Sequence, residues 1–252
     1  MIIAVPTAGL VSGSPFVYRA KLPVPSMKAS LLSTIGQVPT GGKLWLVATY
    51  TSSSLYLTTV SNTGNLAASQ PPTTTSQVVQ TTISIANPQG SPLLSNGVTA
   101  FDPVDVRIMS FSVAGTRGLC TLNTAYQSNG YTKIGIAYYF LDIPASGAAT
   151  QAYSGIFADA AYHAWDGGAA LNPNNVDVAY FVGIVATTPT YTPVTYPTAS
   201  FLGALQRGVG VVSTQALVSG TNGQLLRGFA TPEIRSGDYP AAQIDPDTGV
   251  FW

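Results

Sequence analysis

The sequence predicts an all-β protein, an antiparallel β-sandwich or jelly-roll barrel with long proline-rich loops and at most one or two short helices. Three observations predict this class. Runs rich in Val, Ile, Thr, Tyr and Phe recur between clusters of Gly, Pro, Asn and Ser, which is the pattern of strands separated by turns. Asn-Gly steps separate neighbouring runs at two places. Segments with a helical spacing of apolar residues are scarce.

Each strand is expected where such a run is bounded by turn residues. In chain order the expected strands cover residues 16–21, 43–51, 55–60, 78–86, 104–114, 119–126, 132–141, 176–187, 209–218 and 224–229. In residues 132–141 both alternating sets of side chains become apolar toward the end, which indicates a strand covered on both faces. Short helices are expected only at residues 151–165 and 201–207.

The connections between the strands are also marked in the sequence. Asn129-Gly130 and Asn222-Gly223 each predict a tight hairpin turn. Prolines mark three loops, at residues 69–77, 87–97 and 187–197. We expect one domain over residues 1–252, and the alternative is a division near residues 87–103 into two small barrels.

Charge is the unusual property of this composition. Asp, Glu, Lys and Arg make up 8% of the residues, against roughly 25% in ordinary soluble domains. Ten acidic and ten basic residues give a formal net charge of zero, and the 58 residues from Leu44 to Phe101 contain no charged residue and no histidine. Such a surface has little electrostatic repulsion to oppose association.

The same composition limits the partners. The basic residues are scattered along the chain, whereas binding to nucleic-acid phosphates requires a clustered basic patch. We therefore expect no direct contact with nucleic acid and no docking on anionic lipid. No apolar run reaches the roughly 20 residues of a transmembrane helix, and the first residues lack the basic region of a signal peptide.

Catalytic and metal-binding patterns are weak. The only histidine, His163, lies four residues after Asp159, and two ligands do not make a transition-metal site. Asp102 and Asp105 are near each other, but the Asp-Pro step favours a turn. The only cysteine, Cys120, is expected to be a small buried hydrophobe. We predict no catalytic residue, no cofactor and no enzymatic activity.

The weak calcium candidate is Asp245 with Asp247, which precede Gly249 as in the start of a calcium loop. Too few residues follow for the remaining ligands, so a turn is the preferred interpretation. This turn would deliver Phe251 and Trp252 to an apolar groove of a neighbouring subunit.

Tyrosines supply two further interface candidates. Tyr191 and Tyr196 lie in the proline-rich segment at residues 187–197. Surface tyrosine is favoured at protein interfaces. We therefore group both with Phe251 and Trp252 as candidate contacts between subunits.

Three classes of function fit these observations unequally. The preferred class is a structural protein of the virion, made in the host cytoplasm: a capsid shell, decoration or spike subunit that binds itself and other virion proteins. We expect a trimer, pentamer or hexamer within a lattice. The alternative is an extracellular or phage-tail adhesive module that binds a glycan or another surface. An enzyme acting on polysaccharide is the least favoured class, because the chain has few acidic residues.

Overall fold

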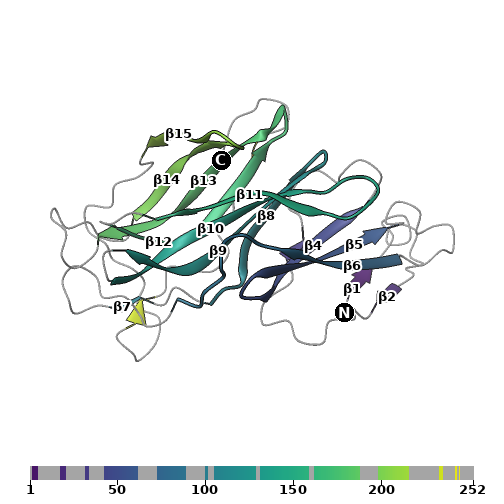
Figure 1. Ribbon diagram of the computed structural model, residues 1–252, viewed down its shortest axis with the longest axis horizontal. Helices are drawn as coiled ribbons and strands as arrows, with labels where there is room; N and C mark the ends of the chain where they lie inside the picture. Colours follow the sequence, from purple (N-terminus) through teal and green to yellow (C-terminus); the bar gives the residue numbers. More distant parts are fainter. Residues whose placement is uncertain are drawn as a thin grey trace, which may run out of the picture.

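The computed structural model of the chain describes residues 2–4, 18–20, 32–33, 43–61, 73–88, 100–101, 105–128, 131–158, 162–187, 198–215, 233–234, 242 and 244. Every regular element within these residues is a β-strand, and no helix occurs among them. The all-β prediction is therefore confirmed. The strands form three four-stranded antiparallel sheets and two short two-stranded pairs (Figure 1).

Three strands of the N-terminal sheet lie within the uncharged stretch. Its strands are, in spatial order, β3 (Leu32–Ser33), β4 (Leu44–Thr51), β5 (Ser54–Ser61) and β6 (Thr73–Gln80). β4 and β5 form a hairpin in which Thr51 pairs with Ser54. β6 pairs with β5 in a continuous register over all eight residues.

The central sheet carries the longest hairpin. Its strands are β8 (Ile108–Ala114), β9 (Arg117–Ser128), β10 (Tyr131–Asp142) and β11 (Thr150–Phe157), in the spatial order β11-β10-β9-β8. Tyr131 pairs directly with Ser128. The predicted strands on either side of Asn129-Gly130 are therefore confirmed as paired neighbours, and the predicted turn itself lies outside the described residues.

The C-terminal sheet is a second meander. Its strands are, in spatial order, β12 (Tyr162–Asn172), β13 (Asn175–Thr187), β14 (Thr198–Gln206) and β15 (Gly210–Gln215). The short pairs are β1 (Ile2–Ala4) with β2 (Tyr18–Ala20), which is antiparallel, and β7 (Ala100–Phe101) with β16 (Glu233–Ile234), which is parallel.

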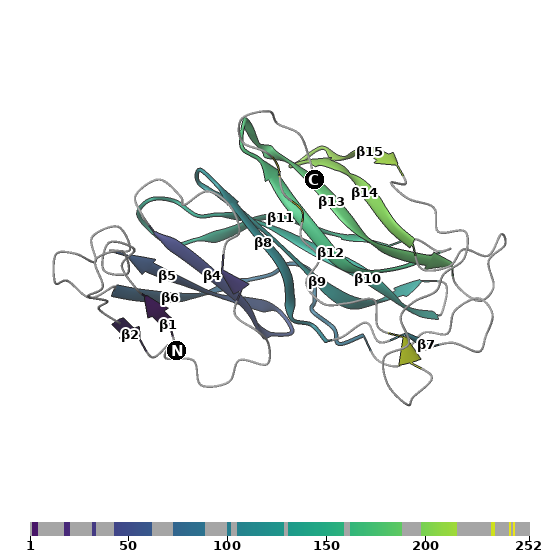
Figure 2. The same ribbon diagram turned by 180° about the vertical axis from the view of Figure 1, so that it is seen from behind.

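The central sheet lies between the other two sheets, as both views show (Figures 1 and 2). One hydrophobic cluster joins its first face to the N-terminal sheet, and a second joins its other face to the C-terminal sheet. On β10, Tyr139 and Leu141 belong to the first cluster, whereas Tyr138 and Phe140 belong to the second. The prediction of a strand covered on both faces is confirmed for β10.

Both predicted helices are wrong. Residues 151–165 contain most of β11 and the start of β12, and residues 201–207 lie almost entirely in β14. Helix propensity is a weak prior that tertiary packing overrides. In β11 the rings of Tyr153 and Phe157 lie 6.2 Å and 5.2 Å from the ring of Tyr138 on β10, so extended backbone lets both side chains join the second cluster.

The boundaries around β6 are also corrected. The predicted loop at residues 69–77 is wrong for residues 73–77, which belong to β6, and the predicted strand at 78–86 ends at Gln80. Hydroxyl side chains are compatible with this strand because they bond across to β5, as the oxygens of Thr58 and Ser76 do at 2.9 Å.

Five other predicted strands, those at residues 43–51, 55–60, 119–126, 132–141 and 176–187, match described strands within a few residues. The predicted strand at 224–229, the Asn222-Gly223 turn and most of the loop at 187–197 lie outside the described residues. The described sheets are open, so a closed barrel is wrong. No described helix is long and apolar enough to cross a membrane.

Candidate functional site

All six residues predicted from the sequence as site candidates lie outside the residues that the structure describes. The calcium candidates Asp245 and Asp247 lie outside the described residues. The same holds for the four interface candidates, which are Tyr191, Tyr196, Phe251 and Trp252. Within the described residues, no three His, Cys, Asp or Glu side chains are grouped so that they could hold a metal ion.

The surroundings of Cys120 and Asp105 are those of residues with a role in the fold. Cys120 is fully buried in the first hydrophobic cluster, as predicted, and burial raises the pKa of its thiol, which disfavours the reactive thiolate. Asp105 pairs with Arg107 at 2.8 Å. Partial burial raises the pKa of Asp105, but hydrogen bonds from the side chain and backbone N–H of Arg107 outweigh it and leave the pKa lowered.

The edge of the C-terminal sheet forms a buried polar seam with the central sheet. β12 is an edge strand, and the backbone N–H groups of such a strand need partners when they are buried. Ala169 N–H donates to Ser110 Oγ at 3.0 Å, and Leu171 N–H donates to Ser112 Oγ at 3.2 Å. The hydroxyls of the central sheet therefore replace a neighbouring strand.

A bulge in β12 continues this seam. The pairing of β12 with β13 shifts between Trp165 and Gly168, and Asp166 has a positive φ of 52°. Asp166 N–H donates to Asn123 Oδ1 at 2.9 Å, while Asn123 Nδ2 donates to Asp166 Oδ1 at 3.4 Å. This reciprocal pair holds a backbone conformation that residues other than glycine seldom adopt.

Close approach of the two sheets depends on small residues. The hydroxyl of Thr121 donates to the carbonyl oxygen of Gly167 and bonds with Ser110 Oγ at 3.0 Å. A Cβ built on Gly167 would lie 2.3 Å from Ile136 Cγ2, closer than two carbon atoms can pack. We use the name β12 seam for the contacts that Ser110, Ser112, Thr121 and Asn123 make with β12.

His163 lies at the start of β12 and faces the central sheet. It is buried, and its Nδ1 accepts a hydrogen bond from the Ile134 N–H at 3.3 Å. Burial, followed by the charge of Lys133, lowers the pKa of His163 to about 4. The imidazole is therefore neutral near pH 7 and acts as a structural acceptor. His163 lies on a strand, not on the short helix expected at residues 151–165.

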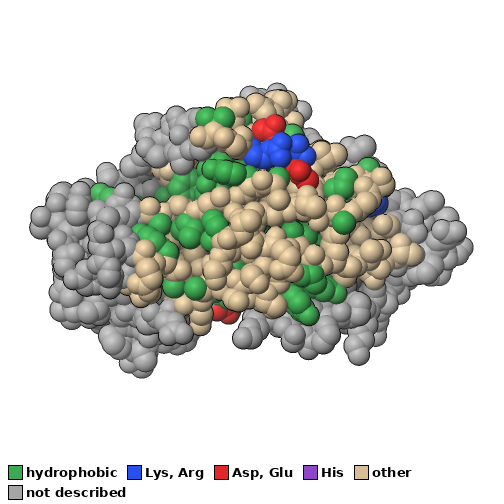
Figure 3. All heavy atoms as spheres, viewed as in Figure 1, with side chains coloured by type: hydrophobic (Ala, Val, Ile, Leu, Met, Phe, Trp, Pro, Cys, Tyr) green, Lys and Arg blue, Asp and Glu red, His purple; other side chains and the backbone are tan. Residues whose placement is uncertain are grey.

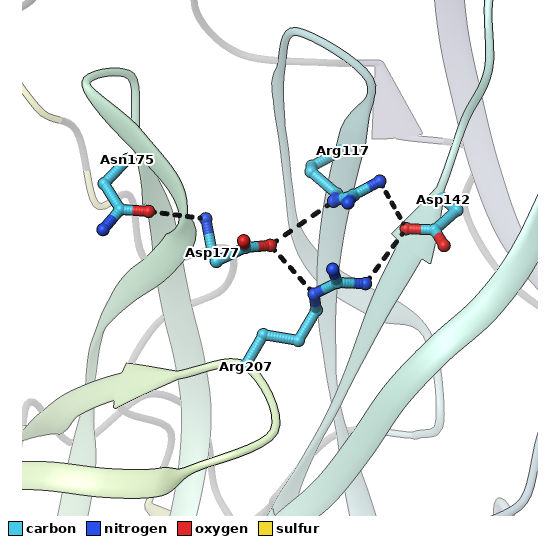
Figure 4. A network of polar contacts seen from close by, with 5 residues as sticks. All are labelled: Arg117, Asp142, Asn175, Asp177 and Arg207. Atoms are coloured by element: carbon cyan, nitrogen blue, oxygen red, sulfur yellow. Dashed lines mark hydrogen bonds and ion pairs between the residues drawn. The ribbon is translucent and has the colours of Figure 1, made fainter.

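A cluster of four charges joins the central and C-terminal sheets at the surface (Figure 4). Asp142 Oδ1 lies 2.7 Å from Arg117 Nη1 and 3.4 Å from Arg207 Nη1. Asp177 Oδ1 lies 2.8 Å from Arg207 Nε and 3.5 Å from Arg117 Nε. Each arginine contacts both carboxylates, so the cluster is neutral as a whole. Its side chains are partly exposed, so each pair contributes little to stability, of the order of 1 kcal/mol or less.

A small recess opens between the N-terminal sheet and the segment after β10. It has a volume of about 140 Å³. Its lining residues are Lys43, Trp45, Leu57, Thr59, Ser61, Thr75, Gln77, Pro144 and Gly147. Lys43 Nζ donates to the Ala145 carbonyl at 2.6 Å. The recess combines an indole edge, an ammonium group and several hydroxyls, and this combination suits a small polar molecule.

The described charged side chains form ion pairs, are buried or hydrogen-bond within the protein. Nine charged residues have described side chains: Lys43, Asp105, Arg107, Arg117, Lys133, Asp142, Asp166, Asp177 and Arg207. Six of them form ion pairs with one another, two are buried, and Lys43 bonds to a carbonyl. On the face shown in Figure 3, charged side chains gather mainly in one small group among uncharged ones.

The β12 seam was not predicted from the sequence, although a signal for it exists. In the strand expected at residues 104–114, Ser110 and Ser112 alternate with the apolar Phe111 and Val113. Hydroxyls that alternate with large apolar residues mark one face as polar but do not say whether that face meets water or a buried edge strand. No protein-family model matches the sequence, and neither a curated protein nor a solved structure has significant similarity to it.

Proposed function

We propose that the protein is a structural subunit of a virus particle that assembles with copies of itself and with other virion proteins. The observation that carries this proposal is the internal use of charge. Each of the nine charged side chains that the structure describes is ion-paired, buried or bonded within the chain. Among the described charged residues, only Lys43 lies at the surface outside an ion pair, so the described surface has little charge to oppose contact with an identical surface.

The chemistry of the described residues agrees with a structural role. Their polar groups hold sheets together and leave no strained or reactive nucleophile. Interface cores are depleted of charged residues, and a hydroxyl-rich surface can supply many hydrogen bonds, each with a net contribution of about 1 kcal/mol. Repetition around a closed symmetric assembly adds such contacts together.

The finer fold assignment belongs to the same proposal. A β-sandwich is supported by the packing of the sheets face to face through two hydrophobic clusters. A jelly roll would in addition require strands distant in the sequence to be neighbours in one sheet. The three described sheets are meanders of consecutive strands, so the sandwich is better supported than the jelly roll.

The proposal is tested by the mass of the purified protein in solution. Light scattering after size exclusion, over a concentration series from about 1 to 100 µM, should detect trimers, pentamers, hexamers or larger closed particles. Because the described surface has few free charges, this mass should change little between low and high salt. A monomer at every concentration would contradict self-assembly.

The recess next to Lys43 favours a second candidate, an adhesive module that binds a small glycan. Trp45, Thr59 and Gln77 line it together with the ammonium group, and hydroxyl and amide groups are suited to sugar hydroxyls. Calorimetric titration with a panel of neutral and acidic monosaccharides would test this candidate. Binding should be lost in Lys43→Ala, and no heat from any sugar would remove the candidate.

A further inference from the structure

We propose that the free edge of β6 is the surface through which one copy of this chain pairs with a second copy, antiparallel and about a two-fold axis. The inference rests on the proposed self-assembly and names the strand that carries it. The two β6 strands would join two N-terminal sheets into one continuous sheet.

β6 is exposed at the edge of its sheet. It pairs with β5 on one side, and within the described part of the chain no strand pairs with its other side. Half of its residues are exposed, and Val79 is its only buried residue. An edge of this kind presents a row of backbone N–H and C=O groups that can pair with another strand.

β6 also lacks the features that normally protect an edge. Its sequence, TTTSQVVQ, contains no charge and no proline, and its register with β5 is unbroken over eight residues. Protective features at sheet edges are charges, prolines, bulges, very short strands or a covering element. β6 has none of the first four, and no described strand pairs with its second edge.

The other described edges are protected. β3 has two residues, β12 is covered by the central sheet, and the pairings of β8, β11 and β15 with their neighbours each contain a register shift. β6 is therefore the one regular, unguarded edge among the three four-stranded sheets as described.

A second copy of β6 suits this edge better than a charged partner strand would. A two-fold axis perpendicular to the sheet puts the same face of both β6 strands on the same side of the joined sheet. Residues that lie opposite each other across the axis therefore have numbers that differ by an even count. With Gln77 on the axis, Thr75 lies opposite Val79 and Ser76 lies opposite Val78. These are β-branched or small uncharged pairs, and no like charges meet.

The test uses opposite charges at Val78, which is 44% exposed. Val78→Lys and Val78→Glu should each raise the dissociation constant for self-association by on the order of tenfold at low salt, because the two like charges would lie on the same face as diagonal neighbours across the paired strands. An equimolar mixture of the two variants should restore association. Sedimentation velocity over a concentration series measures all three samples.

Val209→Lys is the matched control. Val209 is the other exposed large hydrophobic residue among those described, with 69% exposed, and it lies in the turn between β14 and β15. This variant should associate like the unmodified protein. The urea midpoints of all variants, measured at a concentration where the protein is monomeric, should match the unmodified protein, which separates loss of pairing from loss of folding.

The outcomes separate this inference from the proposed function. If the unmodified protein associates and both Val78 variants associate equally well, the proposed pairing through β6 is wrong, while the proposed self-assembly stands. If the unmodified protein is monomeric throughout, both are wrong. Hydrogen exchange on the unmodified protein gives a check without substitutions. Alternate amides of residues 73–80 should gain protection as the protein concentration rises. Unchanged exchange in an associated sample would overturn the pairing through β6.

Discussion

β12 and β6 are both edge strands of four-stranded sheets, yet their free edges are treated in opposite ways. The edge of β12 lies against the central sheet, where Ser110, Ser112 and Asn123 accept hydrogen bonds from its backbone N–H groups. β6 itself carries hydroxyl and amide side chains, and no described strand pairs with its free edge. Hydroxyl-rich sequence therefore serves to complete one edge inside the fold and leaves the other available. The residue types alone do not determine which of these roles a segment has.

The largest difference is expected in amide exchange at a low concentration of protein. The N–H groups of Asp166, Ala169 and Leu171 in β12 bond to buried or partly buried side chains, so they should exchange only when the protein unfolds, at a cost of about 5 kcal/mol or more. The alternate amides of β6 that point away from β5 should exchange without unfolding. Mass spectrometry or NMR would measure both. Equal protection of the two edges would contradict the comparison.

Asn123→Ala should break the closed edge most severely. It leaves the buried N–H of Asp166 without its acceptor and removes a donor to the Asp166 carboxylate. An unsatisfied buried group costs about 1–3 kcal/mol, and more when a charge is involved, so we expect a loss of about 3 kcal/mol in the free energy of unfolding. Urea denaturation measures it. A loss below about 1 kcal/mol would show that water or another group replaces the amide.

Acid should weaken the same edge through His163. Burial and Lys133 lower its folded pKa from 6.5 to about 4, so the unfolded chain takes up a proton first as the pH falls. The neutral imidazole causes no loss of stability above about pH 6.5. As the pH falls below 6.5, the free energy of unfolding decreases, and the loss reaches about 3 kcal/mol near pH 4. Urea denaturation at pH 7, 5.5 and 4.5 measures this decline.

His163→Asn separates this effect from the titration of the carboxylates. Its amide oxygen can replace Nδ1 as the acceptor for Ile134 N–H, but the side chain does not titrate. The decline in stability between pH 6.5 and 4.5 should therefore be shallower than in the unmodified protein. The same decline in stability between pH 6.5 and 4.5 in both proteins would mean that His163 takes up a proton in the folded state as readily as in the unfolded chain.

Ser112→Ala should have the smallest effect on the closed edge. It removes the acceptor of Leu171 N–H, but this bond is only partly buried. Water can replace the hydroxyl in part, so we expect a loss of about 1 kcal/mol, measured by urea denaturation. Thr59→Val, which removes an exposed hydroxyl bond to the Thr75 carbonyl of β6, is the matched control and should cost less. Equal losses would show that the two edges do not differ.

The sequence predicts the centre of the fold better than its edges. β9 and β10 follow from the β-prone runs on either side of Asn129-Gly130, because strand propensity and turn chemistry are local properties. The burial of Cys120 was predicted on the same local basis. The start of β6 was misplaced because its Thr and Ser residues directly follow Pro71-Pro72, which mark a loop.

Features that depend on sheet packing could not be predicted from the sequence. β12 contains DGGAA, whose small residues resemble a helix end, yet they are small because Gly167 packs against Ile136 of the central sheet. The four-charge cluster joins residues 60 and 65 positions apart in the chain. Its pairing requires the registers of two sheets and their relative placement, and neither is encoded in a local pattern.

The burial of both faces of β10 has a consequence for how its alignment is specified. In a sheet with one solvent-exposed face, a shift of the strand register by one residue would move the apolar side chains into water, which is unfavourable. Here Tyr138 and Phe140 would exchange places with Tyr139 and Leu141, so hydrophobicity hardly distinguishes the two alignments. Shape must do so instead: Gly155 leaves room for the ring of Tyr138, and Gly167 and Gly183 leave room for Ile136. In the core of this protein, three residues without side chains fix which way the large ones face.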